Sequence, residues 1–220
     1  PVKFFSSFIS SLPNEKITIE LKDNNLQIEC GKLKTQIQGY NPEDYPIIPE
    51  IKDTESLEID NNKFCQGVSQ VVDIPLPSQA RPEISGIYFI FSKNTLKIAA
   101  TDSFRLAEKT ITLDAPVKKD FAFILPQRPV KELINVLDEK DGVLKVLVSN
   151  NQVLFELGMK EVKHPAVRVI SRLIEGEYPN YNQVIPKQIA QRIKTNTKEL
   201  LSSIRRANLL STPDFQAIKF

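Results

Sequence analysis

Apolar residues recur at helical spacing in four stretches of the chain. The stretches span residues 2–12, 61–72, 128–137 and 195–209. In the third, Val130, Leu133 and Leu137 follow one another at intervals of three and four residues, so they fall on one side of a helix. The pattern therefore predicts four amphipathic helices, each with one face to bury.

Between the predicted helices, apolar and polar residues alternate, and short polar turns interrupt the alternation. Paired alternating runs of this kind are typical of antiparallel hairpins. Three hairpins are expected: residues 16–29 around Asn24-Asn25, residues 87–100 around 92–94, and residues 142–157 around 149–151. The repeat is thus one helix followed by about three antiparallel strands, and the fold class is α+β.

The predicted helices are evenly spaced, and each carries a lysine just before its first strong apolar pair. These lysines are Lys3, Lys63, Lys131 and Lys198, roughly 60 to 68 residues apart, a period typical of repeated supersecondary structure. Recurrence of helices by chance in an unrelated α+β protein is the alternative interpretation.

A longer period is visible in an acidic-Tyr-Pro sequence that two aliphatic residues and another proline follow. It occurs in residues 44–49 and 177–186, about two of the shorter periods apart. Proline fixes φ and cannot donate to a β-ladder, so both copies are interpreted as domain-closing segments. We predict the second half of a domain in residues 1–53, a complete domain in 54–187, and the start of another in 188–220. The chain is expected to be a fragment, with a strand at 218–220.

Composition limits the kinds of partner. The 220 residues include 29 Lys and Arg against 27 Asp and Glu, a net charge of +2, which is too small to coat nucleic acid by bulk charge. Contacts to nucleic acid would need cations gathered on one face. Cys30 and Cys65 lack the spacing of a metal or redox motif and are interpreted as buried thiols of a cytoplasmic protein. No apolar run reaches the ~18 residues of a membrane span.

Residue patterns for catalysis or cofactor binding are scarce. The single histidine, His164, lies next to Pro165 in a basic segment and is interpreted as a solvated loop residue, because a histidine base needs a partner. The sequence contains no glycine-rich phosphate loop and no metal or cofactor motif. Asp102, beside Thr101 and Arg105, could serve a hydrolase as an acid, although aspartate is more often a turn residue.

Residues 98–107, with the sequence IAATDSFRLA, resemble the ATDGHRLA stretch of bacterial DNA sliding clamps, the beta subunits of DNA polymerase III. Further segments are similar to clamp motifs in the same order: residues 3–13, 81–87, 123–128 and 174–186. Each motif is weak singly, but their order and spacing are specific and cover essentially the whole chain. The resemblance implies the DNA-clamp fold, with two helix-plus-strand repeats per domain, and a head-to-tail ring of two three-domain subunits.

The resemblance also implies a function without catalysis. Such a ring encircles double-stranded DNA without sequence preference and tethers the replicative polymerase and repair polymerases through short peptides, while a separate clamp loader uses ATP. The residues implied to face DNA are Lys3, Lys63, Arg81, Gln127, Arg128, Lys131, Lys198, Arg205 and Arg206. The residues implied to form the peptide pocket are Ile84, Thr101, Ser103, Phe104, Arg105, Leu106, Pro179, Gln183 and Val184.

The sequence departs from the clamp pattern at three places. Ser103-Phe104 replaces the common Gly-His, Gln183 replaces a frequent arginine, and an insertion lies around residues 159–168. Other interpretations stay open for single residues: the lysines as solvated helix surface, Ile84 and Leu106 as ordinary core. For the whole protein, the alternatives are a hydrolase that uses Asp102 and a β-rich interaction module that forms no ring.

Overall fold

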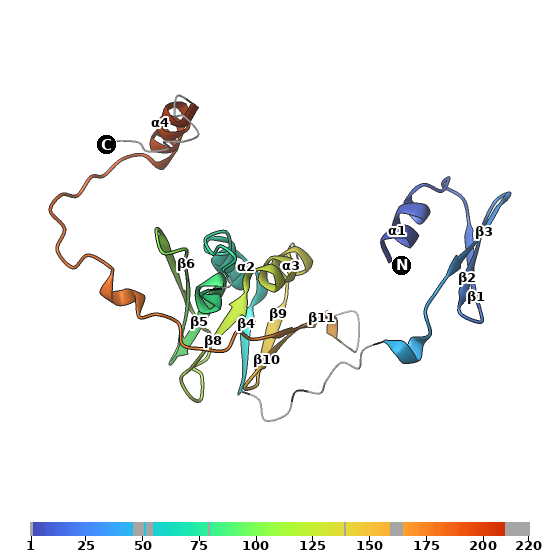
Figure 1. The fold of residues 1–220 in the computed structure, drawn as a ribbon, viewed down its shortest axis with the longest axis horizontal. Helices are drawn as coiled ribbons and strands as arrows, with labels where there is room; N and C mark the ends of the chain where they lie inside the picture. The colour runs from blue at the N-terminus through green and yellow to red at the C-terminus, as the bar shows by residue number, and fades with distance from the viewer. Residues whose placement is uncertain are drawn as a thin grey trace. The chain divides into compact units, whose positions relative to one another are not determined.

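The computed structural model describes residues 2–45, 51, 55–78, 80–138, 140–158 and 165–209. The chain forms two compact units, Pro1–Glu55 and Ser56–Phe220, and each is described by itself (Figure 1). Three predicted features lie outside the described residues: residues 46–49 of the first Tyr-Pro segment, residues 159–164 of the insertion, which include His164, and the strand at 218–220.

The described residues of the first unit form one α-helix, a short 3-10 helix and a three-stranded antiparallel sheet. Its elements are α1 (Val2–Ser10), β1 (Ile17–Lys22), β2 (Asn25–Cys30), β3 (Leu33–Gln38) and a 3-10 helix at Pro42–Asp44. The strands pair in the order β1-β2-β3, which confirms the first predicted hairpin. Lys22 pairs with Asn25, so the turn is Asp23-Asn24, one residue earlier than expected. Asp23 has a φ of 52°, a left-handed conformation that aspartate tolerates better than most residues.

The described part of the chain from residue 55 onward contains eight strands and three α-helices. The strands are β4 (Glu55–Asp60), β5 (Gly86–Ser92), β6 (Thr95–Thr101), β7 (Leu106–Thr112), β8 (Phe121–Pro126), β9 (Val143–Val148), β10 (Gln152–Gly158) and β11 (Pro165–Arg172). The helices are α2 (Asn61–Ser69), α3 (Gln127–Leu137) and α4 (Thr197–Leu209), with 3-10 helices at Pro82–Ser85 and Tyr181–Gln183. The four predicted helices and three predicted hairpins are therefore all present.

The predicted repeat of one helix and three strands is incomplete, because a strand also precedes each of α2 and α3. β4 leads directly into α2, and β8 leads directly into α3. These two lead strands exchange partners, since the sheets have the orders β11-β10-β9-β4 and β7-β6-β5-β8. Each sheet thus combines three strands of one repeat with the lead strand of the other, which joins the two repeats into one body.

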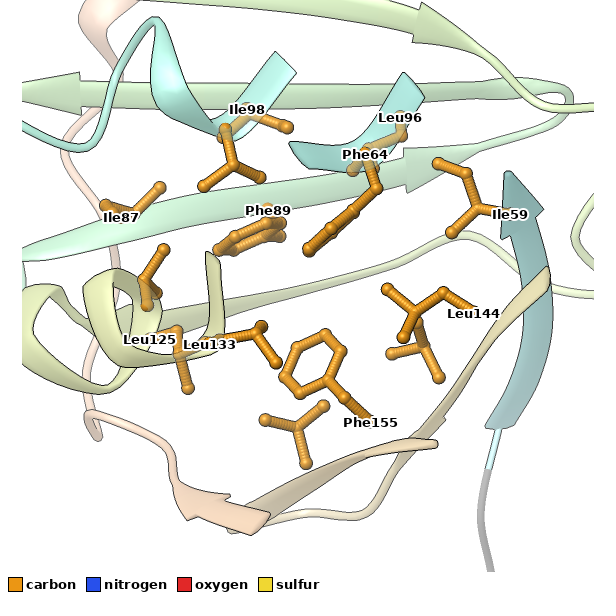
Figure 2. Close-up of a cluster of buried hydrophobic side chains, with 14 of the residues drawn as sticks. Ile59, Phe64, Ile87, Phe89, Leu96, Ile98, Leu125, Leu133, Leu144 and Phe155 are labelled. Carbon is orange, nitrogen blue, oxygen red and sulfur yellow. The ribbon is translucent and has the colours of Figure 1, made fainter. Parts of the chain in front are cut away.

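One hydrophobic core lies between these two sheets and the helices α2 and α3 (Figure 2). Phe64 of α2 links the layers, since its ring centroid lies 6.2 Å from that of Phe89 in β5 and 5.8 Å from that of Phe155 in β10. Alternate residues of β5, namely Ile87, Phe89 and Phe91, are buried in this core, as the two-residue period of a strand requires. The β5 residues between them lie on the other face of the sheet.

Asn61, the first residue of α2, is fully buried. Its Nδ2 donates to the carbonyls of Leu137 at 2.9 Å and Lys140 at 2.6 Å, and its backbone amide donates to the Gly142 carbonyl at 3.0 Å. The last carbonyls of a helix have no intrahelical donors. Asn61, at the start of α2, therefore supplies hydrogen-bond donors to the carbonyls at the end of α3.

Two helices end earlier than the apolar pattern indicated. α1 ends at Ser10, and α2 ends at Ser69. Val71 and Val72 are nevertheless buried in the core. They lie in a turn that follows the helix, in which both of their amides donate to the Val68 carbonyl. An apolar pair in a turn therefore extended the helical pattern beyond the helix itself.

Candidate functional site

The outer face of the β7-β6-β5-β8 sheet, turned away from the main core, carries a second cluster of buried side chains. One row of cross-strand neighbours crosses all four strands: Ile124 on β8, Tyr88 on β5, Ala99 on β6 and Glu108 on β7. Thr101 and Leu106 form the next pair along β6 and β7, on the same face and about 7 Å further on. The turn that joins β6 to β7 begins at this second pair.

Residues 174–184 cross this outer face and are called the strap. The strap begins where the amide of Ile174 donates to the carbonyl of Ile124 at 2.8 Å. The close approach depends on Gly86 of β5, because a Cβ there would lie 2.8 Å from Cδ1 of Ile174. Gly176 then turns the strap with a φ of 117°, a conformation that residues with side chains rarely adopt.

Two tyrosines hold the strap on the sheet. The Tyr178 ring stacks on Tyr88, with centroids 4.6 Å apart, and meets the Tyr181 ring edge-on at 6.4 Å. The Tyr181 hydroxyl donates to Oε2 of Glu108 at 2.6 Å. The strap therefore meets the row of cross-strand neighbours on β8 through Ile174, on β5 through Tyr178 and on β7 through Tyr181.

Burial raises the pKa of both strap tyrosines. The pKa of Tyr178 rises to about 12 because its hydroxyl is buried, and this hydroxyl lacks a hydrogen-bond partner among the described residues. The backbone amide of Thr101 lowers the pKa of Tyr178, against the effect of burial, although the two groups do not have the geometry of a hydrogen bond. Burial first, and the Glu108 carboxylate second, raise the pKa of Tyr181. Both hydroxyls are therefore protonated at neutral pH, as the Tyr181 donor requires.

The turn between β6 and β7 is built around the side chain of Asp102. Its Oδ1 accepts the amides of Phe104 at 3.0 Å and Arg105 at 2.9 Å, and its Oδ2 accepts Arg105 Nε at 2.8 Å. Thr101 Oγ1 donates to the Arg105 carbonyl at 2.9 Å. Ser103 has a φ of 76°, in the left-handed region that glycine adopts without strain. This backbone conformation explains why the clamp motif has glycine at the position of Ser103.

Asp102 is a structural carboxylate in this turn. Hydrogen bonds from the side chain and then the backbone of Arg105 lower the pKa of Asp102 to about 2. Asp102 is therefore ionised at neutral pH and has no proton to give as a general acid. The hydrolase hypothesis loses the acid on which it depended.

The turn and the strap bring predicted pocket residues to one end of the outer face. Leu106 packs against the cluster that contains Tyr178 and Tyr181, so the turn and the strap are contiguous. Phe104, at the tip of the turn, is 97% exposed, and Val184, on the strap, is 73% exposed. Two large apolar side chains thus remain open to solvent, one on the turn and one on the strap, as expected where a short apolar ligand binds.

The other predicted pocket residues differ in exposure. Ile84 lies in the 3-10 helix that contacts β5 and β6 and is buried, as the core interpretation expects. Pro179 is half-buried, whereas Gln183 is exposed. The Arg105 side chain is 59% exposed although its Nε is held by Asp102, so the rest of its guanidinium can still meet a ligand.

The helices α2 and α3 pack side by side (Figure 1) and present the predicted lysines to solvent. Lys63 Nζ lies 2.9 Å from Oδ1 of Asp114, which follows β7, and Lys131 Nζ lies 2.8 Å from Oδ1 of Asp73, which follows α2. The hydrogen bond to Asp114 raises the pKa of Lys63. Neither aspartate was predicted from the sequence, because each looks like an ordinary turn residue and lies far from its lysine along the chain.

Two other residues that were predicted to face DNA instead make hydrogen bonds or ion pairs within the chain. Gln127 Nε2 donates to the carbonyls of Val72 at 2.7 Å and Pro75 at 3.0 Å, so its amide nitrogen fastens the segment after α2 to the start of α3. Arg81 Nε pairs with Oε1 of Glu83 at 3.4 Å. Gln127 therefore has a structural task that the sequence did not indicate.

The remaining predicted cations are exposed on three helices. They are Lys3 on α1, Arg128 on α3, and Lys198, Arg205 and Arg206 on α4. Asn196 caps α4, since its Oδ1 accepts the amides of Lys198 at 2.9 Å and Glu199 at 3.3 Å. The cap explains why this helix begins at Thr197 rather than at residue 195.

Within the ranges that the structure describes, no group of three or more His, Cys, Asp or Glu side chains could hold a metal ion. In the same ranges, no helix has both the length and the apolar character needed to cross a membrane. Cys30 and Cys65 are free and buried, as expected, and burial raises the pKa of the Cys65 thiol to about 11.

Solved structures define the class of this fold. A DNA polymerase sliding clamp from Bacillus subtilis matches 97% of the chain with a TM-score of 0.86 and 29% identity, and the chain covers 55% of that structure. The fold is thus that of a DNA clamp.

Sequence comparison identifies the family. Residues 58–180 match the DNA polymerase III beta subunit, central domain. The chain is 30% identical over 210 residues to a beta sliding clamp of Bacillus subtilis strain 168, and 29% identical over 211 residues to one of Streptococcus pneumoniae serotype 4, in both cases over 95% of the chain and 54% of the relative. The chain belongs to the DNA polymerase III beta subunit family, which is non-catalytic, and it spans about half the length of these relatives.

Proposed function

We propose that the chain is the central part of a sliding clamp that encircles double-stranded DNA and keeps DNA polymerases on it. On this proposal, residues 1–53 are the second half of the first clamp domain, 54–187 the complete second domain and 188–220 the start of the third. The full-length protein forms a head-to-tail ring of two subunits in the cytoplasm, and a separate clamp loader opens the ring. The likeness to a sliding clamp along nearly the whole chain carries the proposal.

In this proposal, α2 and α3 supply part of the DNA-facing surface. Lys63 and Lys131 each pair with an aspartate that is mostly exposed, and exposed ion pairs contribute only about 0–1 kcal/mol. A phosphate can therefore replace the carboxylate at little cost. Because phosphate contacts carry no sequence information, weak and exchangeable contacts suit a ring that slides.

The outer-face site receives short peptides from polymerases and from the clamp loader. Phe104, Leu106 and Val184 supply apolar contacts, and the exposed part of the Arg105 guanidinium is available for a peptide carbonyl or carboxylate. A few anchors in a small concave site are enough for a peptide to bind specifically. Because the site is on the outer face of the sheet, a bound peptide does not compete with contacts made by α2 and α3.

Retention on DNA tests the ring. The full-length protein, loaded onto a nicked circular plasmid, is expected to remain bound during gel filtration at physiological salt. After the plasmid is cut once, retention should fall by about tenfold or more, because the exposed cations alone bind DNA weakly at that salt concentration. Equal loss from circular and linear DNA would contradict the ring and favour the β-rich interaction module.

Removing the aspartate partner of Lys131 should strengthen contacts to DNA. The Asp73→Asn variant is expected to bind a short duplex about twofold to fivefold more tightly at low salt, because Lys131 no longer exchanges a carboxylate for a phosphate. Fluorescence anisotropy over a series of salt concentrations measures this. Lys131→Gln should weaken binding and reduce the magnitude of the salt slope by about 0.9.

The control for Asp73→Asn is Asp141→Asn, which removes one negative charge from a carboxylate that accepts from Asn62 rather than from a lysine. Its effect should be smaller than that of Asp73→Asn. If the two variants bind DNA equally tightly, net charge alone accounts for the change, and the specific role of the Asp73–Lys131 pair is wrong.

A further inference from the structure

We propose that Tyr181 and Glu108 are positioning residues of the peptide pocket, because their hydrogen bond fixes the end of the strap beside Leu106. This inference rests on the proposed function, since the pocket is part of that proposal. Neither residue is among those that the resemblance to clamps assigned to the pocket. Glu108 lies on the row of the sheet next to the Thr101–Leu106 pair, and Tyr181 reaches it from the strap.

The hydrogen bond from Tyr181 to Glu108 is the last fastening of the strap. Upstream, the strap is held by the backbone bond of Ile174 to β8 and by the stacking of Tyr178 on β5. Tyr181 is buried, whereas every residue from Asn182 to Leu200 is exposed. The position of the strap where it reaches the pocket therefore depends on Tyr181, through the packing of its ring against Tyr178 and its hydrogen bond to β7.

A short 3-10 helix transmits the position of Tyr181 to the pocket. The Val184 amide donates to the Tyr181 carbonyl at 3.1 Å, and the Gln183 amide donates to the Asn180 carbonyl at 3.3 Å. Val184, an apolar pocket residue, is thus one backbone hydrogen bond away from the anchored tyrosine. A shift of Tyr181 on the sheet moves Val184 with it.

Glu108 is itself held in place and sets the distance to the turn. Its Oε1 lies 3.7 Å from Lys97 Nζ, while its Oε2 accepts from Tyr181 at 2.6 Å. Leu106 stands two residues earlier on the same strand, and therefore on the same face. One carboxylate on β7 thus fixes the strap relative to Leu106, so the two sides of the pocket keep a constant separation.

The test measures binding of a fluorescent peptide, carrying the C-terminal tail of a bacterial replicative polymerase, to the full-length protein. Tyr181→Phe removes only the hydroxyl, and we expect it to weaken binding by about fivefold to tenfold, which is within the range for the loss of one hydrogen bond of ordinary strength. Glu108→Gln keeps an acceptor for the tyrosine and should bind within about twofold of the wild type. Glu108→Leu, which has no acceptor, should match Tyr181→Phe.

The matched control is Ser92→Ala at the opposite end of the same sheet. Ser92 Oγ also donates to a carboxylate, that of Asp120, at 2.7 Å. This variant loses the same kind of bond, so a purely structural effect would lower its thermal unfolding midpoint as much as Tyr181→Phe does. Its peptide affinity should nevertheless equal that of the wild type.

The outcomes separate this inference from the proposed function. If the wild type binds the peptide and Tyr181→Phe or Glu108→Leu binds it equally well, the positioning role is wrong and the pocket stands. If Ser92→Ala weakens binding as much as Tyr181→Phe, loss of stability explains both, and the positioning role is again wrong. If the wild type does not bind the peptide at all, the proposed pocket fails, and the positioning role fails with it.

Discussion

The Asn61→Ala variant is expected to lose about 2 to 4 kcal/mol of its free energy of unfolding, because two donors of a buried network disappear. In the wild type, Asn61 Nδ2 donates to the carbonyls of Leu137 and Lys140. Without it, both carbonyls at the end of α3 lose their side-chain donor. Urea unfolding, followed by circular dichroism, measures the loss.

Two further variants separate the missing donor from other effects. Asn62→Ala, one residue along α2, removes an exposed hydrogen bond to Asp141 and should change stability by no more than about 0.5 kcal/mol. Asn61→Leu keeps the branched shape of the side chain but has no donor, so it should be about as unstable as Asn61→Ala. A leucine variant as stable as the wild type would show that filling the space matters and that the hydrogen bonds do not.

The Phe104→Asp variant is expected to lose at least about 30-fold in affinity for a polymerase tail peptide, because an apolar anchor of the pocket becomes a carboxylate. Phe104 is 97% exposed in the free protein, so the substitution disturbs no packing and should leave thermal stability unchanged. Fluorescence anisotropy with the labelled peptide measures the affinity, and light scattering checks that the full-length protein is still a dimer.

Val143→Asp is the control for this prediction. Val143 begins β9 and is also an exposed apolar residue, but it belongs to the other sheet of the same body. The Val143→Asp variant should therefore bind the peptide as tightly as the wild type does. If Phe104→Asp keeps its affinity, or if Val143→Asp loses as much, then the peptide does not bind at the turn between β6 and β7.

Local spacing alone was sufficient for the helices and the hairpins. In α3, Val130, Leu133 and Leu137 are all buried in the core, as their intervals of three and four residues predicted. In the β5–β6 hairpin, Ser92 pairs with Thr95 across a two-residue turn. These features depend on neighbours within one or two turns of the chain, so the sequence contains the relevant pattern.

β8, a strand that was not predicted, lacks such a pattern for a physical reason. In β8, Phe123, Ile124 and Leu125 are all buried, because alternate residues face the core while Ile124 lies under the strap. A strand covered on both faces shows no alternation. β4 does alternate, with Leu57 and Ile59 buried, but it pairs with β9 of the other repeat rather than with a neighbour in sequence, so it is not part of a hairpin.

The candidate pocket was predicted only in part. The motif around Asp102 placed one side of it at the turn, and the second Tyr-Pro segment supplied the other side by resemblance. The sequence did not indicate that Tyr178 and Tyr181 hold that segment to the sheet through Tyr88 and Glu108. Nor did it show that Ile84 is buried rather than open to a ligand.

The sequence by itself determined the four helices, the three hairpins and the family, because each depends on short-range spacing or on motifs in a fixed order. The tertiary structure alone decided which strands exchange sheets and which polar groups meet. Asn61 and Leu137 are 76 positions apart, Tyr181 and Glu108 are 73 apart, and Lys63 and Asp114 are 51 apart. Such pairs form only when burial of the whole core offsets the entropy of closing long loops, and no local pattern records that outcome.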